Sequence, residues 1–367
     1  MLSASAPLVL LQHGGLQSLL GKTGLAMLRY RRGPIVAVID PDNAGTELVE
    51  LTGISRPVPV VANLEEALPM GPTVAAIGLA PSGGRIPAVM RRDVEAALAA
   101  GLSLANGLHT PMADDSHLRA LLQPNRWIWD LRREPDKLRV GAARAARSSA
   151  RRVLFVGTDM AVGKMSAALE LHRAGVDQGL AMNFVATGQA GILISGGGIA
   201  LDAVRVDYAA GAVEAAVLEA GAEADWVLVE GQGSLLHPGS TATLPLLRGS
   251  QPTDLVLVHR AGQHHLLSLS PDASSVSIPP LPQVVKLYEA VGAVACPAMS
   301  PPCRLRAIAL NTGHLQLEEA RAAITATQEE TGLFCDDPVR FGGAGLLARL
   351  RERSTTIEPA LGAAARL

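Results

Sequence analysis

The sequence predicts an α/β protein with an N-terminal Rossmann-like domain and a C-terminal P-loop NTPase-like domain, each built on a mostly parallel sheet. Three observations support this fold class. The chain has 367 residues, which is long for a single hydrophobic core. Short apolar runs alternate with helical patterns in both halves, as in βαβ units. A glycine-rich loop follows the apolar run Val153–Val156 and precedes a helical pattern, which is typical of a phosphate-binding loop.

The composition favours a soluble enzyme that acts on a small molecule. Hydrophobic residues make up 48% of the chain and charged residues 18%, whereas the aromatic content of 3% is too low for a binding module that relies on aromatic anchors. The net charge of -2 indicates no nucleic-acid partner. Because no apolar run approaches the ~20 residues of a membrane span, we expect no membrane association. Three cysteines, with no C-x-x-C spacing, are typical of a reducing cytoplasm.

Five short apolar runs in the first half predict strands. Turn-forming residues such as Asp40-Pro41 end these runs, and helical segments separate them. Strands joined in this way form a parallel sheet with right-handed crossovers. The predicted strands are Leu8–Leu11, Ile35–Ile39, Thr73–Ile77, Leu102–Ala105 and Trp127–Trp129.

A second glycine-rich segment in this half has the spacing of a phosphate loop. Gly15 and Gly21 are followed by Lys22-Thr23, but the residues between the glycines are Leu-Gln-Ser-Leu-Leu, an apolar set that favours burial. Asp40 ends the second predicted strand, where dinucleotide-binding folds place a ribose-binding carboxylate. Without a G-x-G-x-x-G motif, an Asp-Pro turn is the simpler interpretation.

The segment Glu134–Ala150 predicts a linker, because it contains a proline and several arginines but no apolar periodicity. The basic residues between Arg139 and Arg152 are expected to be solvated rather than to form a nucleic-acid or membrane patch. We place the boundary near residue 148, which gives a Rossmann-like domain with its linker at 1–148 and a P-loop-containing domain at 149–367.

The loop from Gly157 to Ser166 is the main functional motif. Its glycines let backbone N–H groups point inward, and Lys164 adds a positive charge at a helix N-terminus. The residue after Lys164, which usually gives a hydroxyl to magnesium, is Met165, a poor ligand for that ion. The residues predicted to hold the phosphates are Gly157, Thr158, Asp159, Ala161, Val162, Gly163, Lys164, Met165 and Ser166.

Five further apolar runs in the second half predict strands, and polar or glycine residues follow four of them. Ligands of open parallel sheets bind outside the carboxyl ends of the strands, so these segments should converge on Lys164. The runs are Asn183–Ala186, Trp226–Val229, Leu255–Val258, Val291–Ala295 and Ala307–Leu310. The residues that follow them include Gln189, Glu230–Ser234, His259-Arg260 and Asn311, of which Gln189 and Asn311 are assigned to the cofactor.

Several segments together resemble a bacterial two-domain family, catalogued as domain of unknown function 1611, one branch of which is the DgcN-like D-glutamate N-acetyltransferases. The segments are GTDMAVGKMS, VEGQGSLLHPGS, LVLVHRAG and DPVRFGG, with GKTGLAMLRY, IDPDNAG and NGLHTPM in the first half. The resemblance covers nearly the whole chain. It implies an acetyl-CoA-dependent transfer to the amino group of a D-amino acid, with D-glutamate as the expected acceptor.

The second domain alone is also similar to dethiobiotin synthetase, whose V-E-G-A-G-G motif corresponds to VEGQG here and whose base-reading Asn corresponds to Asn311. That resemblance implies an ATP-dependent reaction in which Glu230 holds magnesium. A nucleotide-binding regulatory protein is a further alternative. Acetyl-CoA fits better, because a glycine loop and Lys164 hold its phosphates without a metal, whereas phosphoryl transfer normally needs magnesium. We therefore assign no metal ligand.

Acetyl transfer to an amine needs a base and donors for an oxyanion. Glu230 and His237 lie seven residues apart on one loop, and either is a candidate base. The alternative for Glu230 is a magnesium ligand or a carboxylate that braces the loop, and for His237 a structural role. The remaining residues of the loop assigned to substrate are Gly231, Gln232, Gly233 and Ser234, with the N–H groups of both glycines as candidate oxyanion donors.

An acidic amino acid needs cations for its carboxylates, and arginine matches them bidentately. Arg260 and Arg340 are the candidates, with surface salt bridges as the alternative. His259 ends a predicted strand and is interpreted as a core histidine. A homo-oligomer is expected, since relatives with this loop often pair subunits across the nucleotide site.

Overall fold

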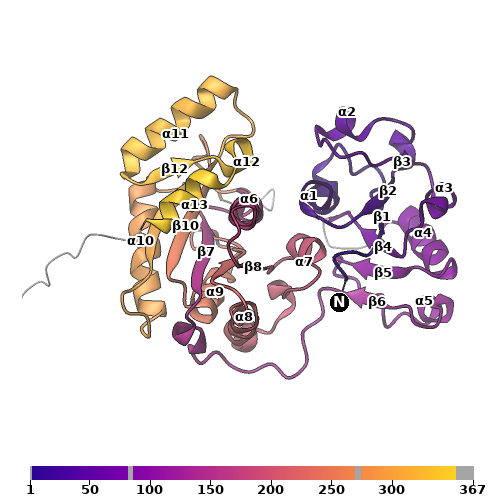
Figure 1. Ribbon diagram of the computed structural model, residues 1–367, viewed down its shortest axis with the longest axis horizontal. Helices are drawn as coiled ribbons and strands as arrows, with labels where there is room; N and C mark the ends of the chain where they lie inside the picture. The colour runs from indigo at the N-terminus through magenta and orange to yellow at the C-terminus, as the bar shows by residue number, and fades with distance from the viewer. Residues whose placement is uncertain (1, 82–85, 269–273, 353–367) are drawn as a thin grey trace, which may run out of the picture.

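Two parallel sheets organise the computed structural model, which describes residues 2–81, 86–268 and 274–352 (Figure 1). In the described residues each sheet has six strands, with the orders β3-β2-β1-β4-β5-β6 and β12-β11-β10-β7-β9-β8. All neighbouring strands run parallel. The first order is that of a Rossmann-like domain. The predicted two-domain α/β fold class is therefore confirmed.

The first domain contains all five strands predicted for it, within one or two residues of the expected bounds. The strand that was not predicted, β3, is only two residues long, too short to show a periodicity. The strands are β1 (Leu8–Leu11), β2 (Ile35–Ile39), β3 (Val60–Val61), β4 (Val74–Ile77), β5 (Ser103–Asn106) and β6 (Ile128–Asp130). The helices are α1 (Lys22–Tyr30), α2 (Leu48–Thr52), α3 (Leu64–Ala67), α4 (Ala88–Ala99) and α5 (Ser116–Leu121), with 3₁₀ turns at Leu19–Gly21, Pro41–Asn43 and Leu68–Met70.

The second domain places its P-loop strand β7 between β10 and β9. Its strands are β7 (Arg151–Gly157), β8 (Met182–Val185), β9 (Trp226–Val229), β10 (Asp254–Arg260), β11 (Arg304–Asn311) and β12 (Phe334–Asp336). Its helices are α6 (Lys164–Asp177), α7 (Gln189–Ser195), α8 (Val206–Ala220), α9 (Thr243–Ser250), α10 (Leu281–Ala295), α11 (Leu317–Thr331), α12 (Pro338–Phe341) and α13 (Ala344–Arg351), with 3₁₀ turns at Arg144–Arg147 and Leu201–Ala203. None of the described helices is both long and apolar enough to span a membrane.

One predicted strand is wrong. The run Val291–Ala295 is the last part of α10. Its valines favour a strand locally, but the run continues the helical period of the buried residues Leu281, Val284, Tyr288 and Gly292. Burial of that stripe against the sheet outweighs the weak intrinsic preference of two valines. The strand that pairs with β11 at this edge is β12, which was not predicted.

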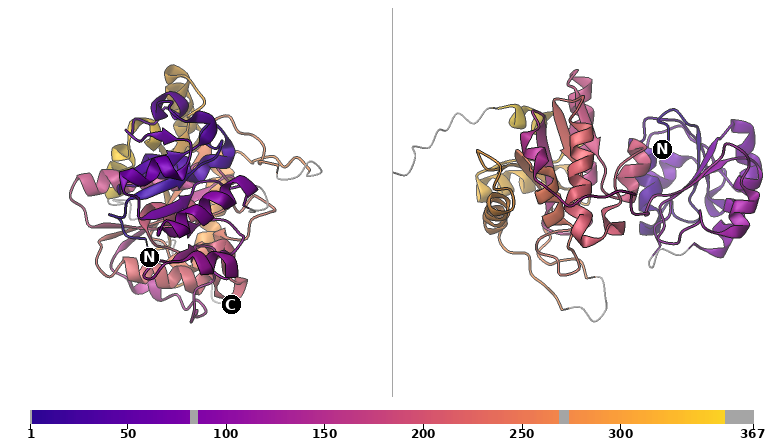
Figure 2. Two further views of the ribbon diagram at one scale, coloured as in Figure 1. Left: turned by 90° about the vertical axis from the view of Figure 1, so that its right-hand side faces the viewer. Right: turned by 90° about the horizontal axis from the view of Figure 1, so that it is seen from below.

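The two domains share one hydrophobic cluster through α7. One face of the first sheet is covered by its own α3, α4 and α5. On the other face, Leu10 of β1 and Ala76 of β4 belong to the same cluster as Ile192 and Leu193 of α7. Figures 1 and 2 show α7 on the side of the second domain that faces the first. The first sheet therefore buries part of its apolar surface against the second domain.

A buried arginine of the first domain forms hydrogen bonds with the C-terminal end of α7. Arg31 follows α1, is 2% exposed, and donates from Nη1 to the Leu193 carbonyl at 3.1 Å and to the Ile194 carbonyl at 3.4 Å. Its Nη2 donates to the Ser3 carbonyl at 2.8 Å. The last carbonyls of a helix have no partner inside the helix. Arg31 therefore caps α7 from the other domain.

The linker arginines are less solvated than expected. Glu214 of α8 accepts hydrogen bonds from the Arg144 N–H at 2.5 Å and from Arg144 Nε at 2.7 Å. Arg152 is 1% exposed and donates to three carbonyls, those of Ser148, Ala150 and Gln251, at 2.9, 2.6 and 2.8 Å. The second part of the linker is thus fixed to the second domain, while the boundary near residue 148 stays a prediction.

Candidate functional site

The P-loop forms a turn of unpaired N–H groups at the start of α6. Within the described part of the chain, the N–H groups of Ala161, Val162, Gly163 and Lys164 form no hydrogen bond. Gly163, with φ of 112°, adopts a conformation that favours glycine and has no side chain to cap the helix. Unpaired N–H groups at a helix N-terminus attract anions.

Lys164 brings a buried charge to this turn. Its Nζ donates to the Asp159 carbonyl at 2.7 Å, and the residue is 7% exposed. Burial lowers its pKa to about 8, while Asp159 and Glu230 act in the opposite direction. A Cβ on Gly157 would lie 2.9 Å from Nζ, and one on Gly231 would lie 2.9 Å from Cδ. Both glycines therefore leave room for the lysine side chain.

Asp159 fixes the P-loop to the segment that follows β10. Its Oδ2 accepts hydrogen bonds from Gln263 Nε2 and from the Leu267 N–H, both at 2.6 Å, and Oδ1 accepts from the Met160 N–H at 2.6 Å. Asp159 was predicted to hold phosphate. Its side chain instead braces the loop, whereas the backbone N–H groups of residues 161–164 stay unpaired within the described chain.

A hydrogen bond between Thr158 and His259 joins the start of the P-loop to the end of β10. Thr158 Oγ1 lies 2.9 Å from His259 Nδ1, and both side chains are buried. Burial, and to a smaller extent His264, lowers the pKa of His259 to about 4. The histidine is therefore neutral near pH 7, in agreement with its interpretation as a core residue.

Glu230 follows β9, which pairs with the P-loop strand β7 on the side opposite to β10. Its Oε2 accepts hydrogen bonds from the N–H groups of Thr187 at 2.8 Å and Gly188 at 3.2 Å, whereas Oε1 meets only Gln232 Nε2, at 3.3 Å. Burial raises the pKa of Glu230 to about 7, although both N–H groups and Lys164 lower it. The structure thus brings Glu230 and Lys164 to the same end of the sheet, as predicted.

His237 uses both ring nitrogens within the fold. Nδ1 accepts a hydrogen bond from the Gly239 N–H at 3.0 Å, and Nε2 donates to the Leu267 carbonyl at 3.0 Å. The residue is 7% exposed. This arrangement favours its structural role over that of a base.

The segment between Glu230 and His237 is tightly packed. Gly233 has a φ of 66°, and a Cβ there would lie 1.6 Å from Ser240 Oγ. Ser234 is buried and donates from Oγ to the Thr158 carbonyl at 3.0 Å. Within the described residues the N–H groups of Gly231 and Gly233 have no hydrogen-bond partner. Within the part of the chain that the structure describes, both N–H groups are therefore available as donors.

Asn311 and Arg340 shape the loop after β11. Asn311 Nδ2 donates to the Val162 carbonyl at 3.0 Å, so this predicted cofactor residue contacts the P-loop. Arg340 donates to Thr312 Oγ1 at 3.1 Å, to the Thr312 carbonyl at 2.8 Å and to the Leu315 carbonyl at 2.7 Å. Two strands, β7 and β10, separate β11 from β9. The structure therefore does not bring Arg340 together with Glu230.

The first domain reaches the site through the loop after β5, which the sequence reasoning missed. A Cβ on Gly107 would lie 3.4 Å from the Cβ of Gln189, the first residue of α7. Asp130 holds this loop by accepting hydrogen bonds from Asn106 Nδ2 at 2.7 Å and from the Met112 N–H at 3.0 Å. The sequence feature that could have indicated this loop is the polar Asn106, which precedes Gly107 at the end of β5. Gln189 thus lies at the junction of the two domains.

The second glycine-rich segment is closed. Gln12 Nε2 donates to the Gly21 carbonyl at 2.9 Å, and a Cβ on Gly21 would lie 1.9 Å from the Gly15 carbonyl oxygen. Lys22 is exposed. The loop folds onto itself rather than around an anion. Asp40 accepts a hydrogen bond from the Gly14 N–H at 2.7 Å, the turn role expected for it.

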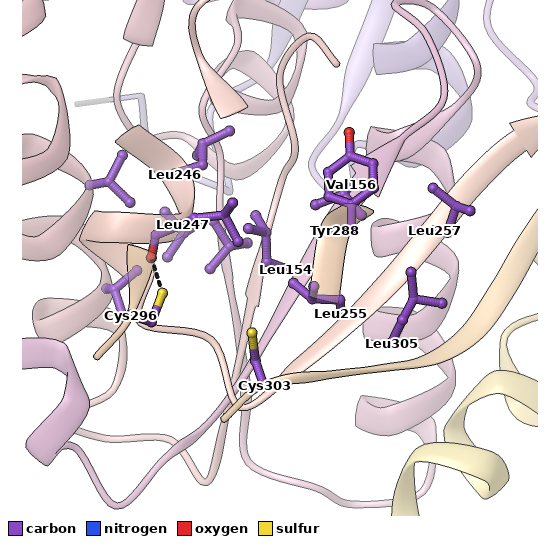
Figure 3. Packing of buried hydrophobic residues seen from close by; sticks show 14 of the residues in the cluster. Leu154, Val156, Leu246, Leu247, Leu255, Leu257, Tyr288, Cys296, Cys303 and Leu305 are labelled. Carbon is purple, nitrogen blue, oxygen red and sulfur yellow. Dashed lines mark hydrogen bonds between the residues drawn. The ribbon is translucent and has the colours of Figure 1, made fainter. Parts of the chain in front are cut away.

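All three cysteines lie in the core of the second domain. Cys296 and Cys303 are surrounded by leucines, and Cys296 Sγ donates to the Leu247 carbonyl at 3.2 Å (Figure 3). Burial raises the pKa values of Cys296 and Cys335 to about 12 and that of Cys303 to about 11. Because the thiolate is the nucleophile, these thiols are unreactive near neutral pH.

Family models match both halves of the chain. A Rossmann-like domain of unknown function (DUF1611_N) matches residues 41–134, and a P-loop domain of unknown function (DUF1611_C) matches residues 139–347. A crystal structure of a DUF1611 family protein from Anabaena variabilis superposes with a TM-score of 0.88 and is 53% identical, covering 94% of this chain and 99% of that one.

Two curated proteins of similar length are also alike in sequence. The D-glutamate N-acetyltransferase of Pseudoalteromonas sp. is 33% identical over 287 residues, which is 78% of this chain and 83% of the relative. The D-glutamate N-acetyltransferase of Tritonibacter scottomollicae is 35% identical over 289 residues, which is 78% of this chain and 84% of the relative.

Proposed function

This chain belongs to the DUF1611 family, and we propose that it is an N-acetyltransferase that transfers the acetyl group of acetyl-CoA to a D-amino acid, with D-glutamate as the acceptor. The two related D-glutamate N-acetyltransferases support the reaction class. The observation that carries the proposal is the unpaired N–H turn with the buried Lys164, placed beside a carboxylate whose pKa is about 7.

The P-loop would hold the pyrophosphate of CoA. The N–H groups of residues 161–164 and the Lys164 ammonium supply donors and positive charge for it. Met165 occupies the position from which a hydroxyl usually holds magnesium. This donor set suits the binding of a phosphate group better than its cleavage.

Glu230 would act as the base through Oε1, the oxygen that accepts no backbone hydrogen bond. It takes one proton from the substrate ammonium, and the freed amine nitrogen bonds to the carbonyl carbon of the thioester. The C–S bond then breaks, and the second proton lost by the nitrogen protonates the departing CoA thiolate. A carboxyl with a pKa near the working pH suits this task.

The N–H groups of Gly231 and Gly233 would stabilise the negative oxygen of the tetrahedral intermediate. Both groups are unpaired within the described residues and lie one and three residues after Glu230 on the same loop. Preorganised N–H donors of this kind typically lower such a barrier by several kcal/mol. The transfer would be direct, because all three cysteines are buried with raised pKa values and suit no acyl-cysteine intermediate.

Titration calorimetry in the presence of a chelator tests the cofactor assignment. Acetyl-CoA is expected to bind without magnesium, and Lys164→Ala should weaken binding by about 1.5–3 kcal/mol, the scale of a hydrogen bond to a charged group. Lys286→Ala is the matched control, because this lysine is exposed on α10. If the protein instead bound ATP but not acetyl-CoA, and did so only when magnesium replaced the chelator, the result would support a ligase related to dethiobiotin synthetase.

A further inference from the structure

A cavity of about 470 Å³ lies next to the P-loop on the side of β10 and β11. Its wall is fixed by Asp159, which holds Gln263 and Leu267 at 2.6 Å, and by His237, which donates to the Leu267 carbonyl. The residues that line this cavity include Met160, Ala161, Arg260, Gln263, His265 and His314. Asp159, which braces the P-loop, thus also fixes one wall of this cavity.

The cavity contains one arginine, and its described lining offers that arginine no counter-ion. Arg260 ends β10 and is exposed, and within the described part of the chain its guanidinium forms no ion pair or hydrogen bond. His265 and His314 are also exposed at the cavity. None of the described residues that line it carries a carboxylate. The guanidinium is therefore available to an anionic ligand.

The strand order gives a direction to a ligand bound at the P-loop. β9, which ends at Glu230, lies on one side of β7, and β10 and β11 lie on the other. Arg260 pairs with Asn311 across these two strands, and Asn311 contacts the P-loop at Val162. If the thioester end of acetyl-CoA reaches Glu230 and the pyrophosphate occupies the P-loop, the opposite end of the molecule extends toward Arg260.

We propose that this cavity is the subsite for the 3′-phosphoadenosine end of CoA and that Arg260 selects for the 3′-phosphate. The proposal rests on the proposed function and refines it. It assigns Arg260 to the cofactor rather than to a carboxylate of the amino acid, because the P-loop strand separates Arg260 from Glu230. A guanidinium binds a phosphate through two parallel hydrogen bonds, which makes the 3′-phosphate a suitable partner.

Calorimetric titration of the full-length protein with acetyl-CoA and with 3′-dephospho-acetyl-CoA tests the subsite. The wild type is expected to bind acetyl-CoA about 10- to 100-fold more tightly, the scale of charge-assisted hydrogen bonds to one phosphate. Arg260→Ala should reduce this preference to about twofold while the affinity for the dephospho compound is retained. Arg321→Ala, an exposed arginine on α11, is the control and should keep the full preference.

The outcomes separate the subsite from the function itself. Equal affinity of the wild type for both ligands overturns the subsite but leaves acetyl-CoA as the cofactor, whereas binding of neither overturns the proposed function. An Arg260→Ala variant that keeps the preference but raises KM for D-glutamate assigns Arg260 to the amino acid and also overturns the inference. Arg260→Gln repeats the test if the alanine variant is poorly folded, as judged by its affinity for the dephospho compound.

Discussion

At the scale of single residues, two roles compete for Glu230. Its Oε2 braces the turn after β8 through Thr187 and Gly188, and its Oε1 faces only the side chain of Gln232. A glutamine at this position keeps an oxygen for the two N–H groups but accepts no proton. The substitution therefore separates the base from the brace.

Glu230→Gln is expected to lower kcat by about 10²–10⁴ while the affinity for acetyl-CoA changes little, because only proton transfer is lost. Steady-state kinetics and calorimetric titration of the same preparation measure both quantities. His237→Ala is the comparison variant. A larger loss of kcat in His237→Ala than in Glu230→Gln would move the base to the histidine, in spite of its two internal hydrogen bonds.

The pH dependence of kcat/KM follows from two buried groups. Activity should rise with pH through about 7 as Glu230 loses its proton, because only the carboxylate accepts one. It should fall again above about 8 as Lys164 loses the charge that attracts phosphate. Because Glu230 and Lys164 interact, the rising and falling parts of the profile give apparent pKa values that belong to the pair rather than to either residue alone. Initial rates at low acetyl-CoA give the profile, and Glu230→Gln should lack the rising limb; an unchanged rising limb contradicts the assignment.

Sequence motifs predicted where the P-loop and Glu230 lie in the fold but not which side chains brace them. The P-loop and Glu230 were predictable because short motifs carry them. Asp159 and Arg340 were assigned to ligands, yet their side chains hold the segments 263–267 and 312–315. Which donor a side chain reaches depends on the path of loops distant in sequence, and no local pattern encodes that path.

At the scale of elements, α7 performs two tasks. Its first residue lies at the domain junction beside the site, and its last carbonyls accept hydrogen bonds from Arg31 of the first domain. The sequence predicted the strands well, because buried parallel strands form short continuous apolar runs. It failed for Val291–Ala295, where a helical stripe and a strand-like composition overlap.

Arg31→Met is expected to destabilise the protein by about 1–3 kcal/mol, because the carbonyls of Leu193 and Ile194 lose their buried donor. Chemical denaturation followed by circular dichroism measures the change. Arg32→Met is the matched control, since its side chain is exposed one residue further along the chain. Equal effects of the two substitutions would show that the contact with α7 contributes nothing to stability.

At the scale of the whole molecule, the two domains form one structure around α7. Leu10 and Ala76 of the first sheet share a cluster with Ile192 and Leu193. The sequence indicated two sheets but not this contact, because α7 has an ordinary apolar pattern that does not identify its partner. The shared cluster places the loop after β5, with Gly107, beside Gln189. The first domain therefore contributes to the edge of the site.

The most direct test of the central proposal is thiol release from acetyl-CoA by the wild-type protein in a chelating buffer, with D-glutamate, L-glutamate and other amino acids as acceptors. We predict stoichiometric thiol release and N-acetylation with D-glutamate, and little or none with L-glutamate. Release should depend on both Lys164 and Glu230. If the folded protein released no thiol with any amino acid of the panel, the proposed acetyl transfer would be contradicted.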